Sequence, residues 1–211
     1  MYLSSAGALT TTQPRAKHPA DRLENLPMIS SPPFAPGIEQ VWPGTRAVPV
    51  PGVRLEYITP ALKTTMEVTN IPVLTLWVSS ANQAGEGRGQ IHASLSELRP
   101  DGSTVELSHG RAGLRALGPK PRKVAIPLSV SAYRIPRGSR LMLTLRGSDA
   151  FAVMPTFGDP LFIHHGRGTE SSIMIPLAPL NRVPPKGKPP SGVAYTDDPL
   201  GAICTTFSLP C

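Results

Sequence analysis

Proline limits this chain more than any other residue type, because it lacks a backbone N–H, locks φ and breaks a helix from within. The 211 residues include 26 prolines, more than twice the roughly 5% that is usual. Ten of them fall in residues 1–60, eight in 176–211 and eight in the 115 residues between. A mainly helical fold is therefore excluded, and we expect the core to form in the low-proline centre.

In that centre, apolar and polar residues alternate with a period of two, which is typical of strands with one buried face. Ranges 73–79 and 172–177 are more continuously apolar, as strands in the middle of a sandwich are, and 53–58 and 104–107 predict shorter strands. The alternating ranges are 90–98, with Ile91, Ala93 and Leu95 inward; 123–130, with Val124, Ile126, Leu128 and Val130 inward; and 140–146, with Leu141, Leu143 and Leu145 inward and Met142 and Thr144 outward.

Turn residues separate these ranges. Pro100-Asp101-Gly102 supplies the positive φ of a tight hairpin, and Pro136-Arg137-Gly138 precedes the strand that starts at residue 140. The glycine-rich segment 85–89 is interpreted as a loop that joins two strands. Apolar residues nowhere recur at helical spacing over three turns. About seven to ten short strands with such turns predict an all-β fold, a β-sandwich or jelly roll.

The proline distribution also predicts the domain organisation. Residues 1–178 would form a single β-sandwich domain with a long irregular connection over 10–50, and residues 179–211 a proline-rich tail. Cys204 and Cys211 lie in that tail, either as a disulfide in an oxidising compartment or as two free thiols. The chain has no run of about 18 apolar residues, so we expect no membrane span. It has no signal-peptide pattern, so as it stands we expect it in the cytoplasm, although the sequence does not determine the compartment.

The formal charge of +7 comes from one stretch. Residues 107–148 contain nine Lys or Arg and no Asp or Glu, whereas the rest of the chain carries twelve basic and fourteen acidic residues. Such a stretch could attract phosphate or an acidic partner. Only one aromatic residue, Tyr133, lies among the basic ones, so the stacking part of a single-strand binding surface is missing. We therefore favour solvent-facing strand and turn residues over nucleic-acid binding.

The sequence contains no pattern that predicts catalysis. No glycine is followed two positions later by serine, which excludes the Gly-x-Ser-x-Gly nucleophile elbow. His164-His165 resembles a metal site only superficially, because neighbouring residues on a strand point to opposite faces. Asp197-Asp198 lacks the acidic spacing of an EF-hand, and the segment 85–89 fails the dinucleotide pattern. We therefore predict no catalytic, metal-binding or cofactor-binding residues and assign no ligand-binding ones.

Three aromatic residues leave a second function open. Trp42, Trp77 and Tyr133 are large enough to form a sugar-stacking platform of the kind that sandwich lectin modules use. Trp77, within an apolar strand, is better interpreted as a core residue. Trp42 either lies at the surface or plugs the sandwich edge.

Several motifs, in the right order, resemble one known domain. The resemblance covers residues 2–178 and rests on motifs that are specific only in combination. It is carried by Tyr2-Leu3-Ser4-Ser5-Ala6-Gly7-Ala8-Leu9, by RLEYITPAL at 54–62, by MEVTNIPVLTLWVSS at 66–80, by SELRPDG at 96–102, by AYRIPRGSRLMLTL at 132–145 and by ESSIMIPL at 170–177. Together they resemble the C-terminal non-catalytic domain of the X-Pro dipeptidyl-peptidase and cocaine esterase hydrolases.

The resemblance implies a jelly-roll β-sandwich of the galactose-binding-like type that packs against an α/β-hydrolase domain. The Ser, Asp and His of that hydrolase domain precede the matched region, so none of them is carried onto this chain. Two departures matter. The family's acidic D-x-D after the Trp-bearing strand is replaced by Ala81-Asn82-Gln83-Ala84-Gly85, and the tail from Asn181 matches only loosely.

These observations predict a non-catalytic sandwich that docks on, or shapes, a hydrolase domain absent from this chain. We expect no catalysis by the chain alone. The alternative is a carbohydrate- or ligand-binding module. A sandwich separated from its neighbour should also expose an apolar face, so self-association into a homo-oligomer is a further expectation.

Overall fold

Alternating leucines and isoleucines build the sheets of this protein, whose computed structural model describes residues 1–25, 52, 54–147 and 158–178. Within that part the only helical element is the 3₁₀ turn η1 (Ser5–Gly7), and no helix is long and apolar enough to cross a membrane. The thirteen strands are β1 (Tyr2–Ser4), β2 (Ala8–Thr10), β3 (Asp21–Leu23), β4 (Arg54–Ile58), β5 (Met66–Asn70), β6 (Val73–Ser80), β7 (Gly87–Leu98), β8 (Thr104–Leu117), β9 (Arg122–Pro127), β10 (Ser131–Ile135), β11 (Arg140–Arg146), β12 (Leu161–His164) and β13 (Ser172–Met174).

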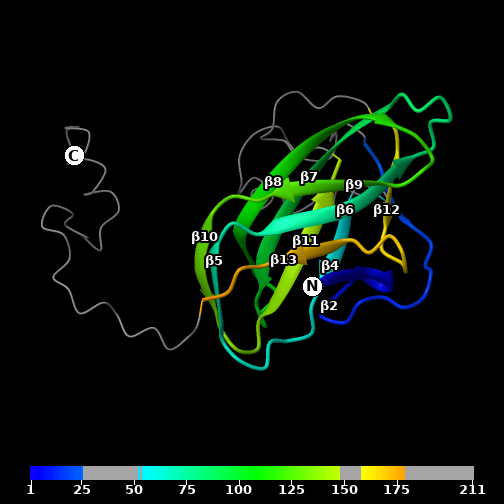
Figure 1. The fold of residues 1–211 in the computed structure, drawn as a ribbon. Helices are drawn as coiled ribbons and strands as arrows, with labels where there is room; N and C mark the ends of the chain where they lie inside the picture. The colour runs from blue at the N-terminus through cyan, green and yellow to red at the C-terminus, as the bar shows by residue number, and fades with distance from the viewer. Residues whose placement is uncertain (26–51, 53, 148–157, 179–211) are drawn as a thin grey trace, which may run out of the picture. The chain divides into compact units, whose positions relative to one another are not determined.

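Eleven of these strands form one continuous sheet that turns back on itself (Figure 1). On one side the order is β4-β11-β7-β8, and on the other β6 pairs with β9 along one edge and with β13 and then β12 along the other. β1 and β2 connect the two sides, because β1 pairs with β13 and β2 with β4. β5 and β10 form a separate two-stranded sheet. The protein is an all-β sandwich, as the sequence predicts.

The core lies between the two sides and includes most of the predicted inward residues. Leu141, Leu143 and Leu145 of β11 face it, and Ile91, Ala93 and Leu95 of β7 lie beside them. From the other side β6 contributes Leu74, Leu76 and Val78, which are fully buried. Met142 and Thr144 point to the opposite side of β11, as expected, yet they too are buried between β4 and β7.

Two strand predictions were wrong. Val130 is 72% exposed rather than inward, because β9 ends at Pro127 and the chain then leaves β6 for β8, where the Ser129 N–H donates to the His109 carbonyl. The strand predicted over 104–107 continues to Leu117 as β8. Its glycines hid it from the sequence pattern, yet Gly110 is needed there, because a Cβ on it would lie 2.5 Å from the Pro127 carbonyl oxygen.

The segment 85–89 is a loop only in part. β7 already begins at Gly87, where a Cβ would lie 2.6 Å from the Leu117 carbonyl oxygen of β8. Residues 1–178 form one compact unit. The connection predicted to be irregular over residues 10–50 contains the strand β3 (Asp21–Leu23), which pairs with β12. The rest of that connection from residue 26, with Trp42, and the tail 179–211 with both cysteines lie outside the described residues.

Candidate functional site

The histidine pair is divided between two environments. His164, the last residue of β12, lies opposite Trp77 of β6, and its Nε2 is 2.8 Å from the Ser79 hydroxyl. Burial, and then the neighbouring His165, lower the pKa of His164 below its ordinary value. His165 is itself fully buried, so the two rings do not face a common ligand. Among the described residues, no group of three His, Cys, Asp or Glu side chains could hold a metal ion.

His165 belongs to a polar cluster that the sequence did not predict. Its Nε2 lies 3.1 Å from the Asp21 carboxylate of β3, and the Tyr57 hydroxyl of β4 donates to the same carboxylate at 2.6 Å. Neither His165 nitrogen meets a partner in good hydrogen-bond alignment, so its contact with Asp21 is mainly electrostatic. Burial raises the pKa of Asp21, but the contacts with His165 and Tyr57 outweigh it and the net shift is downward. The cluster has no nucleophile and ties β3 to β4 and to the end of β12.

A second buried cluster joins two of the motifs that carry the family resemblance. The Glu97 carboxylate of β7 is buried, and it accepts hydrogen bonds from the Ser139 hydroxyl at 2.6 Å and the Tyr133 hydroxyl at 3.0 Å. Arg99 lies 3.4 Å from it. Burial raises the pKa of Glu97, yet these donors together hold it below the ordinary value. The motif residues therefore lock β7, β10 and the turn before β11 together, which is a structural role.

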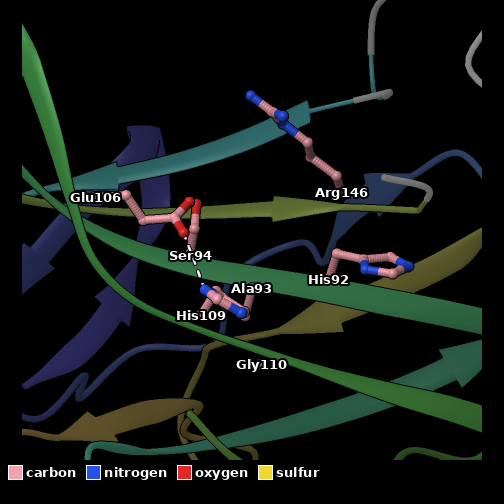
Figure 2. Close-up of a pocket in the computed structure, with 7 residues that line it drawn as sticks. All are labelled: His92, Ala93, Ser94, Glu106, His109, Gly110 and Arg146. Carbon is pink, nitrogen blue, oxygen red and sulfur yellow. Dashed lines mark hydrogen bonds and ion pairs between the residues drawn. The ribbon is translucent and has the colours of Figure 1, made fainter. Parts of the chain in front are cut away.

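An open depression of about 400 Å³ lies on the outer side of β7, β8 and β11. Figure 2 shows the Glu106 carboxylate turned toward the His109 ring, 3.0 Å away, while His92 and Arg146 project away from that pair. The groups do not converge on one point, so the depression lacks the geometry of a catalytic centre. Its polar lining could hold a small polar ligand.

The surface around this depression is dominated by charge. Arg54, Arg146, His92 and Arg111 lie directly opposite one another on four adjacent strands, β4, β11, β7 and β8. We name this surface the charged face, and it comprises Arg54, Glu56, His92, Ser94, Glu106, His109, Arg111 and Arg146. Of the other basic residues of the stretch 107–148, Arg115 and Arg140 lie farther along β8 and β11, and the rest are distributed over β9, β10 and the turns.

Trp77 is not the core residue that we expected. On β6 the positions that face the core are Leu74, Leu76 and Val78, and Trp77 lies between them on the outer side, half-buried. A continuously apolar strand does not reveal which of its faces meets the core, and this caused the error. Tyr133 belongs to the separate β5–β10 sheet and bonds to Glu97, so the structure does not bring it into a stacking platform with Trp77.

The folded chain is thus a β-sandwich whose buried polar clusters hold its strands together. Known proteins similar to it include a family of non-catalytic domains. A family model described as the X-Pro dipeptidyl-peptidase C-terminal non-catalytic domain matches residues 1–161. This protein belongs to that family of domains. No curated protein matches its sequence.

Solved structures show the same fold at low sequence identity. An aminopeptidase from a marine sediment archaeon, Thaumarchaeota, matches 85% of this chain with a TM-score of 0.64 and 16% identity. An α-amino acid ester hydrolase matches 84% (TM-score 0.62, 14% identity), and a CocE/NonD family hydrolase from Staphylococcus aureus 85% (TM-score 0.60, 14% identity). In all three comparisons the match covers only 36% of the other protein's chain.

Proposed function

We propose that this β-sandwich acts as the non-catalytic partner of an α/β-hydrolase domain, on which it docks and whose active site it shapes or shields. One observation carries the proposal: the domain family is non-catalytic, and the matched hydrolases and aminopeptidase devote only 36% of their length to this fold. The buried polar clusters support it, since the Tyr57, Tyr133 and Ser139 hydroxyls all donate to carboxylates within the fold.

The first test is activity. The purified chain, given p-nitrophenyl acyl esters and X-Pro-p-nitroanilides, should show no turnover above a heat-denatured sample. The second test is association: the chain should bind the α/β-hydrolase domain that is encoded with it, upstream in the same gene or in an adjacent one. Turnover that a serine-directed phosphonate abolishes, or the absence of any such hydrolase sequence at the locus, would contradict the proposal.

A ligand-binding role is the second candidate, and the depression on the charged face is the observation that favours it. Calorimetric titration with a glycan panel that includes acidic sugars would test it. Binding that Arg146→Ala weakens would support this role, whereas a panel without any binder would exclude a sugar site there.

A further inference from the structure

The outer side of β6 is unusually apolar for a surface of a sandwich. Strand register places Met174, Val73 and Pro127 on one row across β13, β6 and β9, with Ala125 and Trp77 on the following rows. Phe162 of β12 lies opposite Ser79, one row beyond Trp77. We name this surface the β6 face, and it comprises Val73, Trp77, Ala125, Pro127, Phe162 and Met174. Figure 1 shows its strands β9, β6 and β13 side by side.

These residues do not serve the core. Val73, Trp77 and Phe162 belong neither to the buried core cluster nor to the apolar residues packed against it. Met174 is 60% exposed, and Ala125 and Pro127 are exposed as well. Protein interfaces are enriched in aromatic residues and methionine, and here these residue types lie outside the core.

Polar residues share these outer rows, and two of them satisfy each other. Ser79 and His164 bond to each other, and burial favours the uncharged form of His164. Two charged residues lie on the described rows of this face: Lys123, opposite Trp77, and Arg22 of β3, opposite Phe162 and paired with Glu24. Covering this surface would therefore desolvate little charge, which is the main obstacle to burying a protein surface.

More apolar surface adjoins one end of the β6 face. Among the described residues, four large apolar side chains are exposed: Ile71, Val130, Met174 and Leu177. Ile71 and Val130 adjoin the Asn70–Ser131 pair at the end of the β5–β10 sheet, and Leu177 bridges to Val68 of β5. The Leu128 N–H donates to the Pro72 carbonyl, which holds that end against the row of Val73 and Pro127.

We infer that the β6 face is the surface on which the hydrolase domain docks, an inference that rests on the proposed function above. The place of the first strand supports this occupant. In a family whose domain is C-terminal, the catalytic part precedes the first strand of the domain. Here β1 pairs with β13, and β13 pairs with β6, so β1 lies about 10 Å from the strand of Trp77.

The test uses the full chain and the hydrolase domain encoded with it. Ala125→Glu combined with Met174→Glu places two charges on the β6 face, at exposed positions that leave the core intact. Arg111→Glu is the matched control, because it places the same residue at an exposed strand position on the charged face. We expect the double variant to bind at least about tenfold more weakly and the control to bind within about twofold of the unmodified chain.

The outcomes separate this inference from the function on which it rests. If the unmodified chain binds and the double variant binds equally well, the docking surface is wrong while the proposed function stands. If the unmodified chain does not bind, both fail. Urea denaturation of each variant checks that weaker binding does not come from unfolding.

A label on Trp77 gives an independent readout. Trp42→Phe leaves Trp77 as the only tryptophan of the chain, so 5-fluorotryptophan reports on the β6 face alone. We expect its ¹⁹F resonance to shift or broaden when unlabelled hydrolase domain is added. A resonance that responds to a glycan or to the chain's own concentration, and not to the hydrolase domain, would assign the face to sugar stacking or to self-association and overturn the inference.

Discussion

The two outer faces of this sandwich differ more than their shared core suggests. The charged face has four basic side chains directly opposite one another across β4, β11, β7 and β8. The β6 face has two aromatic rings, a methionine and a proline on strands of the same sheet. Like charges placed opposite each other are unfavourable unless water or counter-ions surround them, whereas exposed rings and methionine are unfavourable in water. The charged face is suited to contact with solvent, and the β6 face to contact with another protein surface.

On the proposed function, the face that a partner covers should depart from the usual polar pattern. A sandwich that worked alone would have polar residues on both outer faces, as antiparallel sheets with one solvated side commonly do. Here only one outer face follows that rule.

The largest expected difference is between the two sides of β6 itself. Leu76 and Trp77 are neighbours, but only Leu76 faces the core. Leu76→Ala should lower the free energy of unfolding by about 2–5 kcal/mol, because it leaves a cavity among buried residues. Trp77→Ala should lower it by less than about 1.5 kcal/mol in the isolated chain, since water already reaches the ring. Urea denaturation of both variants measures this, and a larger loss for Trp77→Ala would mean that the ring is part of the core.

Trp77 also shows how far the sequence could predict the fold. Strands with clear alternation, such as β7 and β11, were found with the correct inward residues, because one buried face fixes the pattern of every second residue. β6 was found but its outer side was mistaken for core, since both sides are apolar. The three-residue strands β1, β2 and β3 are too short to show an alternating pattern. The glycines of β8 interrupted the alternating pattern of that strand.

The polar clusters were harder to predict for a different reason. Glu97 and Ser139 were each part of a recognised motif, but they are 42 residues apart and meet only because β7 pairs with β11. Asp21 and His165 are brought together by the pairing of β3 with β12. No local sequence pattern predicts a contact between residues so far apart in the chain, and only the strand register reveals it.

A medium difference in stability is expected between losing a buried carboxylate and losing one on the charged face. Glu97→Gln should lower the free energy of unfolding at pH 7 by about 1–3 kcal/mol, because an amide nitrogen cannot accept from Ser139 or Tyr133. Glu106→Gln, at the exposed ion pair with His109, should change it by less than about 0.5 kcal/mol. Equal losses in urea denaturation would mean that exposed charges also hold the fold together.

The unmodified chain and the Glu97→Gln variant should differ in their dependence on pH. The pKa of Glu97 is lower in the folded chain than the ordinary value of 4.5, so its stabilisation is complete above 4.5 and is lost as pH falls through the folded value. Glu97→Gln should therefore remove part of the acid destabilisation below that pH. Urea midpoints measured from pH 7 to pH 3 would show the difference; parallel curves would count against a carboxylate held ionised by its donors.

The smallest effect should appear on the charged face and have the opposite sign. Arg146 lies directly opposite Arg54 across β11 and β4, so Arg146→Gln removes one of two adjacent like charges and should raise the free energy of unfolding by about 0.2–1 kcal/mol at low salt. Added salt screens this repulsion, so the gain should shrink as ionic strength rises. Urea denaturation in low and high NaCl measures both. A loss of stability that salt leaves unchanged would mean that Arg146 stabilises the fold through packing, and the charged face would then be less a solvent face than its row of arginines indicates.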